Sequence, residues 1–272
     1  MIASFGGIVL DRPRVMAIVN VTRDSFSDGG ERLDPAQAID DGLRFVSQGA
    51  DLVDVGGEST RPGSRPTPVE EELRRVLPVV EGLAAKNVIV SVDTRRASVA
   101  RACLDAGAHI VNDVSAMRDD AEMLPLVAER GVPVVLTHRR GRAEDEYEGP
   151  AYRDVVEDVR TFLLERAAAC EAAGVPHDRI ALDPGIGFGK SVEENLALIE
   201  GVGRIAAAGY PVLVGSSRKG FIGRLTGIKQ ARLRDPASVW LAVEAARQGA
   251  TIIRVHGVAG TRQALAVWAA MR

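Results

Sequence analysis

An arginine and a histidine stand two residues apart near the end of the chain, in the segment TIIRVHG at 251–257. Alternate side chains of a β-strand share a face, so Arg254 and His256 are predicted to point the same way. A helical pattern from about residue 258 would place backbone N–H groups just beyond them. A guanidinium, an imidazole and a helix N-terminus together favour an anion site. Taken alone, the motif is better explained by a surface arginine and a buried, hydrogen-bonded histidine.

The rest of the chain alternates between two kinds of segment. Short runs rich in Val, Ile, Leu and Ala predict parallel strands buried on both faces, and amphipathic stretches between them predict helices. We expect strands at 14–20, 51–57, 88–94, 109–114, 133–138, 180–185, 211–217 and 251–257, and helices at about 34–49, 68–85, 95–107, 120–131, 151–174, 192–208, 236–249 and 259–271. Eight alternations without a linker predict an α/β fold, a single-domain (β/α)8 TIM barrel over 1–272. An open doubly wound sheet is the alternative, because alternation alone does not show closure.

Polar residues stand at or near the C-terminal ends of most predicted strands. They are Asn20, Asp93, Asn112, His138, Asp183, Ser217, Arg254 and His256. In a barrel all of these strand ends meet at one rim, and active sites are built there. The pattern therefore predicts an enzyme.

The rim residues divide by charge. Asp93, Asn112 and Asp183 are suited to a small polar heterocycle with several N–H donors and acceptors. The alternative is that one or two of them only cap the following helix.

The basic residues predict a polyphosphate site. Lys219 follows a strand in GSSRKGF, and Arg61 lies in the Gly- and Pro-rich loop ESTRPGSRP. Together with the Arg254 and His256 pair they match the charge of a polyphosphate. Arg218, next to Lys219, is interpreted as structural.

Two loops after the first two strands add further candidates. Asn20, Asp24 and Asp28 in NVTRDSFSDGG are consistent with a Mg²⁺ held mainly by substrate phosphate oxygens and water. The loop GGESTRPGSRPTP is suited to a lid. Asp54 and Glu58 beside it are interpreted as structural partners of neighbouring polar groups.

The segment DPGIGFGK lacks the spacing of a nucleotide-binding P-loop and is a weak phosphate signal. Phe188 within it would form a stacking wall for a planar ligand, or a part of the core.

Composition excludes several other classes of protein. A net charge of −3 gives no general attraction to nucleic acid or to an anionic membrane. No apolar run approaches the roughly 18–20 residues that cross a bilayer, and the first residues lack a signal-peptide pattern. We therefore expect a cytoplasmic protein in which Cys103 and Cys170 are reduced packing residues.

With these motifs assembled, the chain resembles the dihydropteroate synthases over essentially its whole length. The motifs that carry the resemblance are NVTRDSFSDGG, DVGGESTRPG, SVDT, NDVS, LDPGIGFGK, SSRKGF and RVH, in the order of that family. The resemblance implies a (β/α)8 barrel that joins 6-hydroxymethyl-7,8-dihydropterin diphosphate to 4-aminobenzoate in folate biosynthesis, with sulfonamides competing for the aminobenzoate site.

The resemblance also implies residue roles. It places Asp93, Asn112, Asp183 and Lys219 on the pterin, Arg254 and His256 on the diphosphate, and Asn20 on Mg²⁺. Asp24, Asp28, Thr60 and Arg61 would close the site, and Phe188, Ser217 and Lys219 would line the aminobenzoate side. Catalysis itself is expected to involve Lys219, Asp24, Asp28 and Arg61.

Three positions depart from the family pattern. Arg23 replaces a proline in the first loop, and Arg139 stands where the family often has methionine. An arginine there would either stack on the pterin or turn outward. Gly257 replaces an aspartate that would cap the last helix.

Two other functions are consistent with parts of the pattern. A methyltetrahydrofolate-type methyltransferase barrel would read a pterin but leave Lys219, Arg254 and His256 without a purpose. A non-catalytic pterin-binding paralogue would keep the residues and lose the reaction. The family implies a homodimer, whereas Trp240 and Trp268 in the last helices are consistent with either internal packing or a dimer face.

Overall fold

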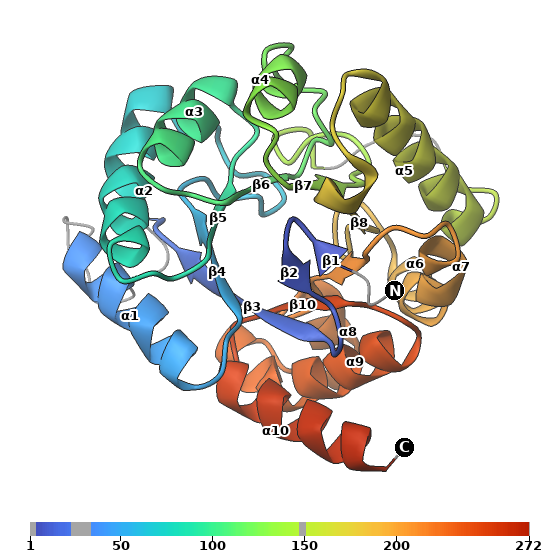
Figure 1. Ribbon diagram of the computed structural model, residues 1–272. Coiled ribbons are helices and arrows are strands. Elements are labelled where there is room, and N and C mark those ends of the chain that lie inside the picture. The colour runs from blue at the N-terminus through green and yellow to red at the C-terminus, as the bar shows by residue number, and fades with distance from the viewer. Residues whose placement is uncertain (1–3, 23–33, 147–150, 272) are drawn as a thin grey trace.

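The strands of the protein form a closed barrel (Figure 1). The computed structural model describes residues 4–22, 34–146 and 151–271. Eight parallel strands lie in the order β8-β7-β6-β5-β4-β3-β10-β9. A bridge between Leu182 and Val212 joins the two ends of this order, so the closed barrel is confirmed over the open sheet. The strands are β3 (Arg14–Asn20), β4 (Leu52–Gly56), β5 (Val90–Asp93), β6 (Ile110–Asp113), β7 (Val134–Thr137), β8 (Ile180–Asp183), β9 (Leu213–Val214) and β10 (Ile252–Val255).

Helices surround the barrel in Figure 1, and their apolar faces pack on the outer side of the strands. They are α1 (Pro35–Ser47), α2 (Val69–Ala84), α3 (Ala97–Asp105), α4 (Met123–Arg130), α5 (Val155–Ala172), α6 (Val192–Glu200), α7 (Val202–Ala206), α8 (Gly220–Thr226), α9 (Asp235–Arg247) and α10 (Val258–Ala270), with 3-10 turns at η2 (His177–Arg179) and η3 (Ala231–Arg234). None of the helices in the described ranges is long and apolar enough to cross a bilayer.

Two features of the helical layer differ from the prediction. The helix expected at 192–208 is broken into α6 and α7 at Gly201. A Cβ at Gly201 would lie 2.7 Å from the methyl groups of Val156, so a glycine there permits close packing against α5 but weakens the helix. The short helix α8 was not predicted, since its seven residues are too few to establish a helical period.

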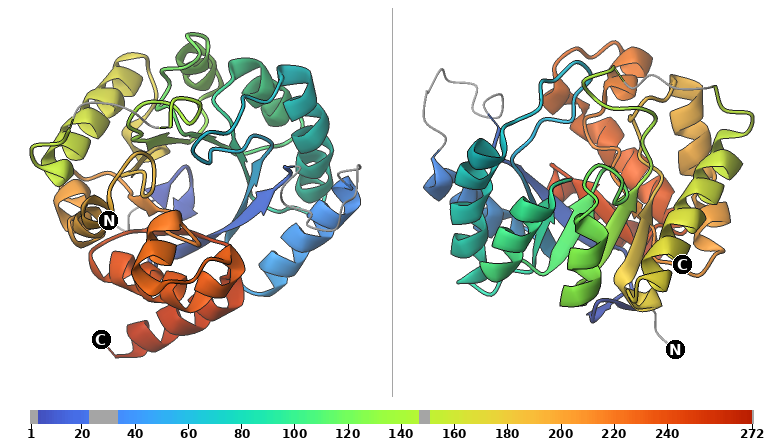
Figure 2. Two further views of the ribbon diagram at one scale, coloured as in Figure 1. Left: turned by 180° about the vertical axis from the view of Figure 1, so that it is seen from behind. Right: turned by 90° about the horizontal axis from the view of Figure 1, so that it is seen from above.

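An antiparallel hairpin covers the N-terminal end of the barrel and was also missed. Its strands are β1 (Ser4–Phe5) and β2 (Ile8–Val9), which are too short to show a period. The hairpin lies at the end of the barrel opposite the long loops (Figure 2). Phe5 is fully buried there against an apolar layer to which most strands contribute one residue. Sequence periodicity therefore found the walls of the barrel but not this end of it.

The barrel interior changes from apolar to polar along its axis. Leu52, Ile110, Ala181 and Ile252 belong to the apolar layer near the hairpin. Side chains two residues further along a strand face the same way. That step leads from each of these four to a polar residue, namely Asp54, Asn112, Asp183 and Arg254. The strands thus place a polar layer inside the C-terminal end of the barrel.

The burial of Phe5 leads to a stability prediction. Phe5→Ala is expected to lower the free energy of unfolding by about 3–5 kcal/mol, because it empties a fully buried site at the barrel end. Val9→Ala on the same hairpin is the control, since Val9 is 46% exposed and should cost less than about 1 kcal/mol. Urea unfolding followed by circular dichroism measures both, and equal losses would show that the hairpin does not close the core.

Candidate active site

A buried ion pair lies at the centre of the polar layer. The Arg254 guanidinium donates through Nε to Asp54 Oδ2 at 2.6 Å and through Nη2 to Asp93 Oδ2 at 2.7 Å. Asn112 Nδ2 donates to the same Asp54 oxygen at 3.0 Å. Asp54 is fully buried, so the interpretation of this residue as a structural partner is confirmed. Four strands, β4, β5, β6 and β10, are joined by these contacts.

The role of Arg254 toward a diphosphate stays a prediction. Two of its nitrogens bind carboxylates in the structure. Within the described part of the chain, Nη1 makes no hydrogen bond that would occupy it. Arg254 can therefore bind Asp54 and Asp93 and still donate from one nitrogen to a ligand oxygen.

Asp93 occupies an environment that changes its proton affinity. Burial raises the pKa of Asp93 to about 7; the Arg254 guanidinium opposes this shift, and the neighbouring Asp54 carboxylate adds to it. The carboxyl group can therefore act as a hydrogen-bond donor or an acceptor near neutral pH, which is suited to a heterocycle that presents both kinds of atom.

Asp93 and Asn112 do not cap the helices that follow them, so the helix-cap alternative is wrong for these two residues. The turn after β6 is instead held by Asp113, which accepts from the N–H groups of Ser115 and Met117. The first N–H of α3 is bound by Asp120. The side chains of Asp93 and Asn112 are thereby left to the barrel interior.

Asp183, Phe188 and Lys219 meet on the other side of the rim. Asp183 Oδ1 accepts from Gly185 N at 2.7 Å, and Lys219 Nζ lies 3.9 Å from the centre of the Phe188 ring. Burial lowers the pKa of Lys219 to about 8, and Arg254 acts in the same direction. Phe188 thus takes part in a cation–π contact at the rim.

His256 lies in a positive electrostatic field. Its Nδ1 is 3.0 Å from Ser217 Oγ, which also accepts from the His256 backbone N–H at 3.2 Å. Burial lowers the pKa of His256 to about 3, with Arg218, Arg254, Lys219 and Arg61 acting in the same direction. An imidazole that burial and four cations keep neutral marks a place where an anion would be stabilised. Arg61, Lys219 and Arg254 of the predicted basic set therefore all act on the pKa of His256.

Lys190, in the glycine-rich segment after β8, serves the protein's own backbone. Its ammonium group is buried and donates to the carbonyl oxygens of Gly185 at 2.8 Å and Phe188 at 3.3 Å. It also lies 3.1 Å from His138 Nδ1, and burial lowers its pKa to about 7. The contacts of Lys190 do not support the weak phosphate signal of this segment. The informative signal is the glycine run itself, because Gly185 and Gly187 have positive φ and the Gly185 carbonyl accepts from Lys190.

The departures from the family pattern have definite outcomes. Arg139 does not turn outward, but is buried and paired with Asp119. Stacking of Arg139 on the pterin stays a prediction. Gly257 is the N-cap of α10 and supplies no side-chain bond to its N–H groups. Arg218 binds Asp235 at 2.6 and 2.7 Å, so its structural interpretation is confirmed. Arg23 lies outside the described residues.

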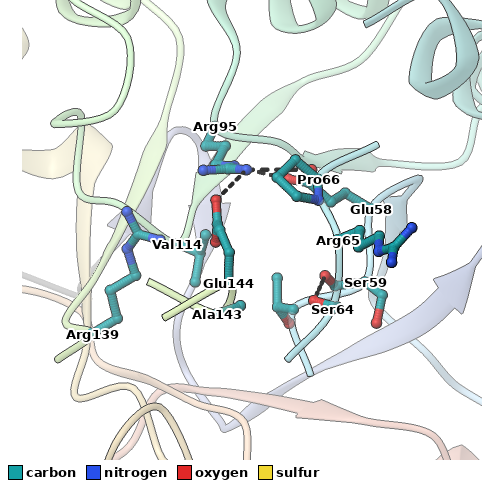
Figure 3. Close-up of a pocket in the computed structure, with 11 residues that line it drawn as sticks. Glu58, Ser59, Ser64, Arg65, Pro66, Arg95, Val114, Arg139, Ala143 and Glu144 are labelled. Atoms are coloured by element: carbon teal, nitrogen blue, oxygen red, sulfur yellow. Dashed lines mark hydrogen bonds and ion pairs between the residues drawn. The ribbon is translucent and has the colours of Figure 1, made fainter. Parts of the chain in front are cut away.

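The loop residues are only partly placed. Asn20 is exposed at the end of β3, while Asp24 and Asp28 lie outside the described residues. Thr60 and Arg61 belong to the loop between β4 and α2. Thr60 lines a pocket among the loops at this end of the barrel; Figure 3 labels other residues of the same lining, such as Glu58 and Glu144. Of the residues that the structure describes, Thr60 is the one member of the predicted site that lines this pocket.

The donor set for a metal ion is small. Within the ranges that the structure describes, no group of three or more His, Cys, Asp or Glu residues could hold one. Asn20 offers a single neutral oxygen. Among the described residues, this donor set fits a Mg²⁺ that would take most of its ligands from phosphate and water.

Comparison with known proteins identifies the family. Residues 16–256 match the family model described as pterin binding enzyme. The chain is 48% identical to dihydropteroate synthase of Mycobacterium leprae, over 93% of this chain and 92% of that protein.

Solved structures agree with this family assignment. A Xanthomonas albilineans dihydropteroate synthase with 4-aminobenzoic acid is 50% identical, with a TM-score of 0.91 over 97% of this chain and 94% of that one. A structure of the enzyme from the same organism with 7,8-dihydropteroate is 48% identical, with a TM-score of 0.88 over 97% and 95%. The chain belongs to the dihydropteroate synthase family of pterin-binding enzymes.

Proposed function

We propose that the chain is a transferase that condenses 6-hydroxymethyl-7,8-dihydropterin diphosphate with 4-aminobenzoate, giving 7,8-dihydropteroate and diphosphate. The observation that carries the proposal is the polar layer at the C-terminal end of the barrel, in a chain 48% identical to a synthase whose structure holds 7,8-dihydropteroate. Sulfonamides would compete with the aminobenzoate.

The acidic side of the layer would bind the pterin. Asp183 lies at the end of β8 and can accept two N–H groups from the pyrimidine edge. Asn112 and Asp93 stand on the adjacent strands β6 and β5, in register with one another. These residues face inward from strands, so they would hold the ring in a fixed orientation.

The basic side would stabilise the departing diphosphate. The bond between the methylene carbon of the pterin and the diphosphate oxygen breaks, and the electron pair leaves with the oxygen. Lys219, Arg254 and His256 would neutralise the developing charge together with the N–H groups at the start of α10, which no side chain caps. The electron-rich dihydropterin would stabilise the cationic methylene, which favours an SN1-like path.

The arylamine nitrogen of aminobenzoate would then bond to the methylene carbon and lose one proton to solvent. Thr60, Arg61, Phe188 and Ser217 would surround this substrate. An arylamine is nucleophilic without a strong base, so the reaction requires no activated Ser or Cys.

Magnesium would contribute charge neutralisation at the leaving group. Asn20 would hold it beside the diphosphate oxygens, and Asp24 and Asp28 on the first loop would lie near it.

Exposed apolar side chains support a homodimer. Leu225, Leu233, Trp240 and Val267 are all more than half exposed on α8, η3, α9 and α10. Trp268, in contrast, packs against the core. A second copy of the chain would cover this surface, in agreement with the family expectation, and we place the enzyme in the cytoplasm with small molecules as its other partners.

The first prediction about the proposed reaction concerns Lys219. Lys219→Ala should lower kcat/KM about 100-fold or more, because it removes a half-buried cation that would face the developing charge. Diphosphate release and dihydropteroate formation are measured together, with and without 4-aminobenzoate and Mg²⁺. Lys86→Ala, an exposed lysine just after α2, is the matched control and should match the wild type.

Two outcomes of that assay would change the proposal. Pterin binding without turnover in the wild type would indicate a non-catalytic paralogue. Full activity of Lys219→Ala would remove this residue from the reaction.

The second prediction concerns protonation of His256. Binding of inorganic diphosphate should raise its pKa by about one unit or more, since a nearby anion favours the charged imidazole. An NMR titration of the histidine ring signals measures the shift. His177, which is in η2 before β8 and bound to Glu171, serves as an internal control and should not move. An unchanged His256 pKa at saturation would place the diphosphate elsewhere.

The third prediction concerns assembly. The wild type should be a dimer by light scattering at micromolar concentration, and Trp240→Glu should shift it to monomers because a charge would then be buried in the interface. Val46→Glu on α1 is the control and should stay dimeric. A monomeric wild type would overturn the proposal.

A further inference from the structure

Arg95 connects three loops at the rim of the barrel. It lies in the turn between β5 and α3, and its guanidinium binds a carboxylate from each of three other loops; two of these, Glu58 and Glu144, are shown in Figure 3. Nε donates to Glu58 Oε2 at 2.8 Å, Nη1 to Asp119 Oδ2 at 2.8 Å and Nη2 to Glu144 Oε1 at 3.1 Å. Glu58 follows β4, Asp119 follows β6 and Glu144 follows β7. The Arg95 side chain therefore links the loops that follow four consecutive strands, β4 to β7.

The contacts of Glu58 fix the loop that carries Thr60 and Arg61. Glu58 Oε1 accepts from Thr67 N at 2.9 Å, which joins the two ends of the loop. Arg96 Nη2 also donates to Glu58 at 2.9 Å and to the Thr67 carbonyl at 2.7 Å. The loop at 58–67 is thus closed on itself and bound to the turn after β5.

The same loop rests directly on the segment after β7. Gly63 N donates to the Ala143 carbonyl at 2.8 Å. Arg95 binds both segments that this hydrogen bond joins, because Glu58 begins the loop at 58–67 and Glu144 lies next to Ala143. Asp119 adds a second connection, because it also binds Arg139. Arg139 therefore replaces a family methionine with a residue that joins this network.

Arg95 is the cation that three carboxylates of different loops share. Glu58, Asp119 and Glu144 converge on it, and the side chains of Arg95, Glu58 and Asp119 are each about 10% exposed. Without Arg95, three carboxylates would face one another across a partly buried gap; in the described part of the chain, Arg96 still pairs with Glu58 and Arg139 with Asp119, with Arg142 at 3.9 Å from Asp119. Removal of one partner from a buried ion network leaves uncompensated charge and is strongly unfavourable. The resulting repulsion would move the loops apart.

We propose that Arg95 is a positioning residue that sets the distance between the loop at 58–67 and the segment at 139–146, and thereby places Thr60 and Arg61 over the aminobenzoate side of the site. The proposal rests on the proposed function for its substrate. Arg95 acts through the loops and touches neither substrate. The pterin residues Asn112 and Asp183 stand on strands, so they do not depend on it.

The test compares Arg95→Met and Arg95→Lys with the wild type. In Arg95→Met the KM for 4-aminobenzoate should rise about 10-fold or more, while the KM for the pterin diphosphate changes less than about threefold. Arg95→Lys keeps the charge but cannot reach all three carboxylates, so its KM should lie between the two. Arg101→Met, which removes an exposed arginine of α3 that is 3.9 Å from Glu129, is the matched control. Equal increases in both KM values, or none, would overturn the proposal.

A second measurement needs no turnover. Backbone hydrogen exchange at 58–67 in the protein without substrate should be about 10-fold faster or more in Arg95→Met, and unchanged in the strand at 252–255. Exchange that stays as in the wild type would overturn the proposal, even if the wild-type protein proves inactive.

Loss of folding is addressed by a charge-balanced variant. Arg95→Met combined with Glu144→Gln removes one of the converging carboxylates and should recover part of the slow exchange and of the KM. If Arg95→Met alone does not fold, the test uses Arg95→Lys. A smaller increase in the KM for 4-aminobenzoate and in hydrogen exchange at 58–67 would support the proposal. Wild-type values of both would overturn it.

Discussion

The ion pair between Arg254 and Asp54 is the contact on which the site depends. A carboxylate that is fully buried inside a barrel is tolerated only when a cation and further donors compensate for its lost hydration. Arg254 supplies the cation and Asn112 a second donor. Because Asp93 binds the same guanidinium, the ends of four strands hold one another in register. The inward-facing residues around this pair therefore have little freedom to move.

This pair also separates the site into two electrostatic regions. Asp54 and Asp93 compensate part of the Arg254 charge, and Asp235 compensates part of the Arg218 charge. Burial and these cations together keep the His256 pKa near 3. The acidic residues at this end of the barrel can thus bind a polar ring, and the basic residues beside them can bind an anion. A substrate that joins a pterin to a diphosphate matches that division.

The loops are held by charges of their own rather than by the barrel strands. Lys190 fastens the glycine turn after β8 through carbonyl oxygens, and this turn carries Phe188 toward Lys219. Arg95 performs a similar task for the segments after β4 and β7, with carboxylates in place of carbonyls. In both cases a buried cation satisfies acceptors that the loop would otherwise leave without hydrogen bonds.

The sequence by itself determined the alternation of strands and helices, and with it the rim on which the polar residues gather. Both are local patterns, since a strand shows its period within a few residues. It also predicted the barrel, but closure depended on the contact between Leu182 and Val212, which no local pattern reveals. The hairpin of Phe5 was missed for the same reason, because two-residue strands have no period and gain stability only from what they cover.

Only the tertiary structure decided which partner each polar residue takes. Arg254 and Asp54 are 200 positions apart, and no spacing in the chain indicates that they meet. The segment DPGIGFGK gave only a weak phosphate signal in sequence, and its Lys190 binds carbonyl oxygens. Arg139 pairs with Asp119 from another loop. A residue type limits the contacts that a side chain can make, whereas the closed barrel selects among them by bringing distant strand ends together.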